Sequence, residues 1–144
     1  MSSNIVTSSD LYEHIDAVLS TGYFDENTSL VPQAAIAFCR LLWDSLDATQ
    51  RDGVAAAQNF LNGKEESYAI QLNVFSRRID QDPSLSEGGR PVALNRLVWT
   101  ALNANTGLSD LAGEFLVELG LAAGLSPEQI ATVFADLVPG FEQE

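Results

Sequence analysis

Apolar residues recur along this chain at intervals of three and four, the spacing that places them on one face of a helix. The stretch from Val31 to Leu46 is more apolar than the rest, because its apolar residues would cover nearly the whole circumference of a helix. Only a narrow strip of Gln33, Arg40 and Asp44 is polar there. A helix that is apolar all round is usually surrounded by other elements. We therefore expect a central helix over 31–46, with the rest of the chain packed around it.

The two largest side chains of this stretch, Phe38 and Trp43, are expected in the core. Cys39 lies next to Phe38 and is interpreted as a small buried hydrophobe. Pro32 suits the first turn of the helix, where its missing N–H would have no partner within the helix. The stretch therefore predicts the centre of the hydrophobic core.

Six further helices are expected from apolar periodicity and from the residues that start and stop helices. Ser8 or Ser9 caps the first of these helices and Gly22 ends it, and Asp47 starts the second, which ends before Gly63. The next three run from Lys64 to Ile79, from Pro91 to Asn105 and from Asp110 to Ala123, and the last starts at Ser126 and is stopped by Pro139. Asp47 and Gln50 have the spacing of a capping box, and the same spacing separates Ser126 from Gln129. Gly53 weakens its helix by about 1 kcal/mol relative to Ala, which makes sense if another helix passes close.

Seven helices and no stretch of strand-like alternation predict an all-α fold. A chain of 144 residues is the size of one domain and can bury a core without a disulfide or a metal. The connections between the expected helices are short, which favours antiparallel neighbours. No internal repeat of about 33–47 residues is visible, so a helical solenoid is disfavoured. We expect a single compact bundle over residues 1–144.

Charge is unevenly distributed along the chain. It has 20 acidic and 7 basic residues and a net charge of −13. Every Lys and Arg lies between Arg40 and Arg96, so residues 1–39 and 97–144 carry acids alone. Such a field repels nucleic acid and anionic lipid, and it attracts basic protein surfaces. The alternative is that the acidity serves solubility alone.

The composition offers few groups for catalysis or metal binding. One Cys excludes an internal disulfide, and the single His, His14, cannot supply the paired ligands of a zinc protease or a di-iron bundle. No Gly-rich phosphate loop precedes a helix with a Lys. We expect no enzyme activity, no cofactor and no metal site, and we interpret His14 as a partly exposed helix residue.

No apolar run approaches the ~18 residues that suggest a membrane span, because Glu114 and Glu118 interrupt the longest candidates. The N-terminal residues lack the basic and apolar regions of a secretory signal. The chain is therefore expected to be soluble and cytoplasmic, without membrane or nucleic acid among its partners.

Three carboxylates, Asp110, Glu114 and Glu118, recur at four-residue spacing on one side of their expected helix. We call them the acidic stripe. Like charges at this spacing destabilise a helix by roughly 0.2–0.5 kcal/mol per pair, and residues 97–144 contain no cation to offset the repulsion. The acidic stripe is interpreted either as a solvated face or as a docking site for a basic partner.

The segment from Ala35 to Lys64 resembles a known family. It has Cys39 followed by Arg40, then Trp43 one turn on, and an Ala-rich helix that ends in the sequence FLNGK. This arrangement is similar to helical immunity proteins of bacterial polymorphic-toxin systems. The resemblance implies a small, cytosolic, non-enzymatic protein that binds and neutralises a cognate toxin. It supplies no catalytic residue and transfers no contact residue.

Two functions are consistent with these observations. The first is an acidic all-α inhibitor that binds a protein partner with a basic surface, such as a toxin, through the acidic stripe. If that toxin is a nuclease, the acidic face would compete with nucleic acid for its cationic groove. The second is a non-enzymatic structural or oligomerisation domain whose acidity serves solubility. The identity and activity of the toxin and the oligomeric state are left open by the sequence.

Overall fold

The structure, a computed structural model, describes residues 7–23, 27, 29–102, 109–138 and 141; the side chains of Leu19 and of residues 109–114 lie outside the description. The helices are α1 (Ser8–Ser20), α3 (Leu30–Leu41), α4 (Ala48–Leu61), α5 (Tyr68–Gln81), the short α6 (Leu85–Gly88), α7 (Arg90–Leu102), α8 (Ser109–Ala122) and α9 (Pro127–Leu137), with a 3-10 turn, η1 (Trp43–Ser45). These described ranges contain no strand, which confirms the expected all-α fold.

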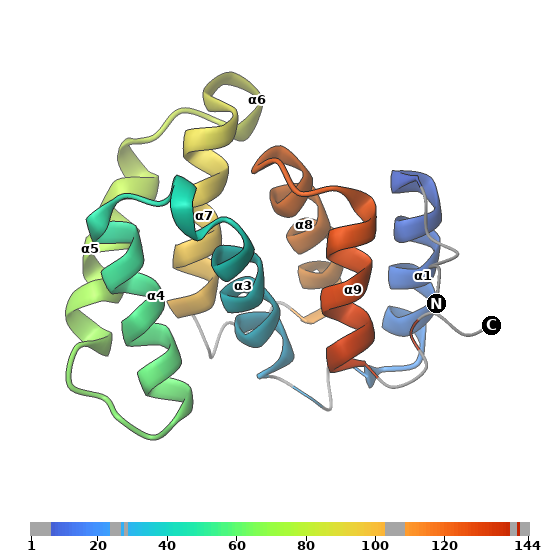
Figure 1. Ribbon diagram of the computed structural model, residues 1–144, viewed down its shortest axis with the longest axis horizontal. Helices are drawn as coiled ribbons and strands as arrows, with labels where there is room; N and C mark the ends of the chain where they lie inside the picture. The colour runs from blue at the N-terminus through green and yellow to red at the C-terminus, as the bar shows by residue number, and fades with distance from the viewer. Residues whose placement is uncertain (1–6, 24–26, 28, 103–108, 139–140, 142–144) are drawn as a thin grey trace.

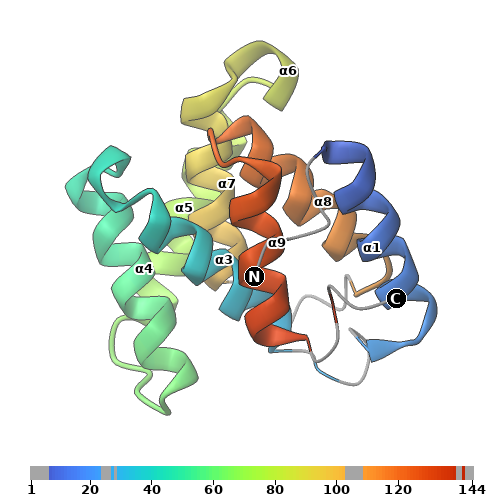
Figure 2. The ribbon, with the colours of Figure 1, turned by 45° about the vertical axis from the view of Figure 1, so that its right-hand side comes forward.

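Helices α3 and α7 lie side by side in the middle of the molecule (Figure 1). On one side α4 and α5 pack against each other and against α7. On the other side α8 and α9 pack against α3, and α1 packs against α8 and α9. Figure 2 shows the same arrangement from a second direction. Helices from the beginning and the end of the chain therefore share one side.

One hydrophobic cluster runs through the whole bundle. Phe38 on α3 is fully buried, and its ring meets the ring of Phe134 on α9 edge-on, with 6.0 Å between the centroids. Helix α8 approaches closely at Gly120, where an added Cβ would lie 2.9 Å from Ile130 Cδ1 and 3.1 Å from Phe38 Cε2. The expected core position of Phe38 is confirmed. Apolar residues that recur at three- and four-residue intervals on the other helices are buried too: Leu11, Ile15, Val54, Ala57, Phe75, Leu94, Leu97, Val98, Ala101, Leu102, Leu116, Leu119, Ile130 and Val133.

The expectation of one helix over 31–46 is wrong. Helix α3 ends at Leu41, and Trp43 begins the separate turn η1, where it is half-buried rather than in the core. The helical conformation breaks at Leu42, with φ −102° and ψ 13°, before the extended conformation of Asp47 that begins the capping box of α4. Arg51 then donates to the Trp43 carbonyl from Nε at 3.2 Å and from Nη2 at 3.0 Å, and its guanidinium lies over the Trp43 ring.

Helix α3 is also not covered on all sides. Ala34, Ala35 and Cys39 are fully buried, but Leu41 is 52% exposed and Ala37 is half-buried. Helices α4, α7, α8 and α9 cover the rest of its circumference. A face that the sequence predicts to be buried is therefore at the surface.

The fourth helix begins later than expected, at Tyr68 rather than at Lys64. The Lys64 N–H donates to the Asn59 carbonyl at 2.8 Å, and the Gly63 N–H donates to the Phe60 carbonyl at 3.0 Å. These two bonds form a Schellman cap with Gly63 at φ +85°, so Lys64 belongs to the end of α4.

The cap of the first helix is also one residue earlier than expected. Thr7, and not Ser8 or Ser9, exchanges hydrogen bonds with Asp10: each backbone N–H donates to the other side chain at 3.2 Å. Asp10 therefore completes a capping box with Thr7. The capping boxes predicted at Asp47 and Ser126 are both present.

Other helices do pass close to Gly53, which the sequence could suggest but not show, and this contact predicts the effect of a substitution. A Cβ at this position would lie 2.6 Å from Val98 Cγ1 and 2.7 Å from Phe75 Cε2. Gly53→Ala gains about 1 kcal/mol of helix propensity, but overpacking a buried contact between helices typically costs about 1–3 kcal/mol. We expect a lower free energy of unfolding in urea. Asp52→Ala, at the exposed neighbouring position, should leave stability unchanged or higher, and a Gly53→Ala protein as stable as that control would exclude the close contact.

Candidate functional site

The structure describes one member of the acidic stripe. Glu118 is exposed on α8, whereas the side chains of Asp110 and Glu114 lie outside the description. On the opposite face of the same helix, Leu116 and Leu119 are buried and Phe115 is partly buried. The exposure of Glu118 agrees with the expected orientation of α8, and the acidic stripe as a whole stays a prediction.

Packing extends the acidic region beyond α8. Helices α1, α8 and α9 contain no Lys or Arg, and they lie together on one side of the molecule (Figure 1). Five described carboxylates are exposed there: Glu13, Asp16, Glu118, Glu128 and Asp136. We call the exposed surface of these three helices the acidic side. Two acidic segments that are far apart in the sequence are thus joined in space.

Some of the Arg side chains form hydrogen bonds that stabilise the fold. Arg51 holds the turn at Trp43 through the two hydrogen bonds to its carbonyl. Arg90 on α7 donates from Nε to the Ala123 carbonyl at 2.9 Å and from Nη2 to Ser45 Oγ at 2.8 Å. It therefore caps the carbonyl end of α8, a position where a cation is favoured by the helix dipole. The sequence of α8 supplies no such cation, and α7 supplies it across the fold.

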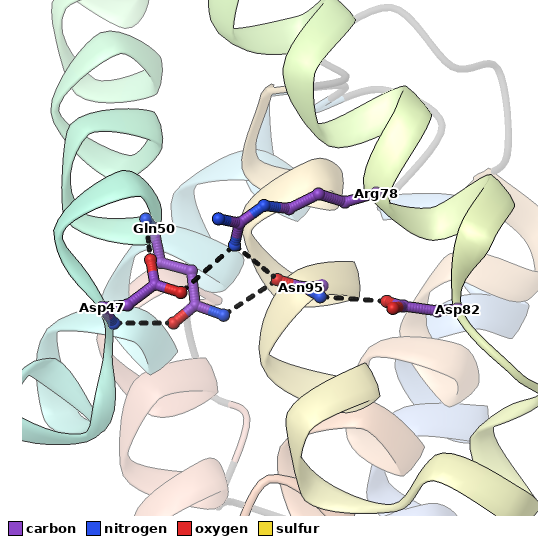
Figure 3. Close-up of polar contacts among 5 residues, drawn as sticks. All are labelled: Asp47, Gln50, Arg78, Asp82 and Asn95. Atoms are coloured by element: carbon purple, nitrogen blue, oxygen red, sulfur yellow. Dashed lines mark hydrogen bonds and ion pairs between the residues drawn. The ribbon is translucent and has the colours of Figure 1, made fainter.

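Side chains from three helices meet in a polar network (Figure 3). Asn95 on α7 is its centre: its Oδ1 accepts from Gln50 Nε2 at 2.9 Å and from Arg78 Nη1 at 3.2 Å. Its Nδ2 donates to Asp82 Oδ2 at 2.9 Å. Arg78 also pairs with Asp47 Oδ2 at 3.2 Å. These groups satisfy one another and join α4, α5 and α7, so the network is a structural feature.

The network affects the ionisation of Asp47. Burial alone would raise the pKa of this carboxyl. The Gln50 N–H, at 2.7 Å from Oδ1, and the hydrogen bond and positive charge of Arg78 outweigh that effect and hold the pKa below its ordinary value. The ionised carboxylate is therefore the form that caps α4.

Cys39 and His14, the only Cys and the only His of the chain, both pack within the fold. Cys39 is buried, and burial raises the pKa of its thiol to about 12. It therefore stays a neutral thiol near pH 7, which confirms its interpretation as a small buried hydrophobe. His14 is half-buried on α1, where Nδ1 donates to the Asp10 carbonyl at 2.9 Å and the ring lies 5.8 Å from that of Phe141.

Metal binding and membrane insertion each require a particular arrangement of residues. No group of three or more His, Cys, Asp or Glu residues in the described ranges is placed to hold a metal ion. No described helix combines the length and the apolar character needed to cross a bilayer.

A groove runs along the uncovered face of α3, between α4 and α9. Two adjoining pockets of about 390 and 400 Å³ form it, and both are lined by Ala37 and Arg40. Ile36, Leu61 and Leu137 line the first pocket, and Leu41, Val133 and Asp136 line the second. We call this the α3 groove. The sequence did not predict the α3 groove, because the apolar pattern around Leu41 predicts that this side chain is buried in the core.

Comparison with known proteins adds no relative. No protein-family model, no curated protein and no solved structure matches this chain. The resemblance to helical immunity proteins therefore stays a prediction.

Removing the centre of the polar network should destabilise the fold. Asn95→Ala leaves the Gln50 amide, which is in a residue only 6% exposed, without its acceptor. A buried polar group without a partner costs about 1–3 kcal/mol, and we expect this loss in the free energy of unfolding in urea. Asn73→Ala, at an exposed position on α5, is the matched control. Equal stability of the two variants would show that the network does not hold the helices together.

The lowered pKa of Asp47 predicts a pH dependence. Because the pKa in the folded state is below the unfolded value of about 3.9, ionised Asp47 stabilises the fold above that value, and the contribution is lost as pH falls through the folded pKa. Asn at this position keeps a cap acceptor without the charge. The stability difference between wild type and Asp47→Asn should therefore shrink as the pH is lowered from about 6 to about 3. When Arg78 is also replaced by Gln, the stability difference between Asp and Asn at position 47 should be smaller at every pH. A stability difference that does not change with pH would contradict the lowered pKa of Asp47.

Proposed function

We propose that this protein is an acidic, non-enzymatic inhibitor that binds a partner protein with a basic surface, in the manner of a helical immunity protein binding its cognate toxin in the cytoplasm. The observation that carries the proposal is the gathering of the base-free helices α1, α8 and α9 on one side. Glu13, Asp16 and Glu118 are exposed there and form no ion pair with other described residues.

The physical basis is long-range electrostatics. A surface of one sign steers an oppositely charged partner and raises the association rate by about 10- to 1000-fold at low ionic strength. The bases of this chain offset that field only at its edges: α1, α8 and α9 contain none, Arg90 reaches the end of α8, and Arg40 lines a pocket with Asp136. A toxin whose active site binds an anion such as nucleic acid would offer the complementary surface.

The alternative function is a helical structural or oligomerisation domain. In this case the acidic residues only keep the protein soluble, and no partner depends on them. The two functions differ in what happens when the charges are removed without unfolding the protein.

The first test is neutralisation in cells. The protein encoded beside this chain in its source genome is expressed from an inducible promoter, alone and together with this chain. We expect growth arrest in the first case and restored growth in the second. A neighbouring protein that is harmless, or whose toxicity this chain does not relieve, would contradict the proposal.

The second test is the association rate of the purified proteins. The triple variant Asp110→Asn, Glu114→Gln, Glu118→Gln should bind this partner with an on-rate lower by on the order of tenfold at low salt, because charges at the rim of an interface act mainly on association. Adding moderate salt should reduce the difference by screening.

A matched control removes the same charge elsewhere. Glu65→Gln, Glu66→Gln, Glu87→Gln changes three exposed carboxylates outside the acidic side, and it should bind nearly as fast as wild type. Melting curves of both variants verify folding. An equal on-rate for wild type and the stripe variant at low salt would reject docking through the acidic stripe.

A further inference from the structure

The α3 groove exposes apolar surface that the rest of the bundle covers elsewhere. Leu41 is one of two large apolar side chains among the described residues that are mostly exposed, the other being Ile70 on α5. Leu41 lies in the groove beside Ala37, whose small side chain leaves both pockets open. The groove borders the acidic side, because Asp136 on α9 lines its second pocket. Its described lining does not include Glu118 of the acidic stripe, so binding in the groove is tested separately from the proposed function.

Arg40 gives the groove a chemical preference. Its side chain is exposed between the two pockets, and among the described residues this side chain forms no hydrogen bond or ion pair. Arg51, Arg78 and Arg90, in contrast, each have protein partners. Apolar side chains lie on both sides of Arg40, among polar residues such as Gln58 and Thr132. Asp136 also lines the second pocket but forms no ion pair with Arg40, so the guanidinium can pair with a carboxylate that has apolar neighbours.

The groove is suited to a helix. It is concave, so two copies of α3 cannot meet across it, because α4 and α9 stand on either side. Its walls are helices, and the described parts of the chain offer no strand edge to which an extended segment could add. A helix satisfies its own backbone hydrogen bonds and presents side chains at three- and four-residue intervals.

We propose that the α3 groove binds an amphipathic helix of a partner protein, with one carboxylate on its apolar face. The carboxylate pairs with Arg40. Apolar side chains one turn before and one turn after it enter the two pockets, against Leu61 and Leu137 in one and against Leu41 and Val133 in the other.

The test selects the ligand without assuming its sequence. A phage-displayed library of helical peptides is used, with one face randomised and the fixed positions balanced between Lys and Glu. It is panned against the folded wild-type protein and counter-selected on Arg40→Glu. We expect enriched peptides with an acidic residue that has large apolar residues three or four positions before and after it.

Variants then assign the binding to the groove. Arg40→Glu should weaken a selected peptide at least tenfold, and a peptide with Lys in place of the acid should recover affinity for this variant. Ala37→Gln, which fills the wall common to both pockets, should weaken binding to a similar extent. Arg77→Glu makes the same charge change at an exposed position on α5 and should bind like wild type. Melting curves verify that all variants fold.

Three results would overturn the proposal. The first is no enriched peptide, and the second is enriched peptides that bind wild type and Arg40→Glu equally. The third is self-association of the wild-type protein that Arg40→Glu abolishes, because the groove would then belong to an interface between copies of this chain. The neutralised acidic stripe should leave peptide binding unchanged, so failure here is separate from failure of the proposed function.

Discussion

The packing of α3 against α7 is the contact on which the rest of the structure depends. Each fully buried Leu or Phe stabilises the fold by roughly 1.5–3 kcal/mol, and Phe38 and Leu97 are both fully buried in this pair. Helices α4, α5, α6, α8 and α9 each contact at least one of the two. Small side chains such as Ala34, Ala35 and Ala93 are fully buried and leave room for close approach. The pair is therefore the support for helices on both sides.

This central pair separates the two kinds of surface. On one side are α4 and α5, with Arg51, Arg77 and Arg78, and on the other are α1, α8 and α9, which carry no base. The uneven charge of the sequence thus becomes uneven charge in space. Several bases are used within the fold, as Arg90 shows by capping α8, so they contribute less to recognition than their number implies. The acidic side supports the proposal that the partner has a basic surface. The α3 groove, with Leu41 and Val133 in its lining, is a second candidate binding surface.

Local signals were sufficient for much of this fold. The capping boxes at Asp47 and Ser126 could be inferred from neighbouring residues alone, since each depends on four consecutive residues. The close approach at Gly53 could only be suggested, because it depends on Phe75 and Val98 of two other helices. The network at Asn95 could not, because it joins residues 45 and 17 positions away along the chain. The exposure of Leu41 likewise depends on how the neighbouring helices pack against α3. The spacing of apolar residues along the chain does not predict that packing. Much of the candidate site was likewise beyond the sequence, because α1 joins α8 and α9 only through tertiary packing.

Native-state hydrogen exchange tests the central role of the α3–α7 pair most directly. Amides of the most stable unit exchange only through global unfolding, whereas peripheral helices exchange through smaller openings. The slowest amides should lie in the middle of α3 and α7, and α1, which packs on α8 and α9, should exchange faster. The slow amides should share the denaturant dependence of global unfolding. Slowest exchange in α1 or α5, with α3 and α7 opening at lower free energy, would contradict the account.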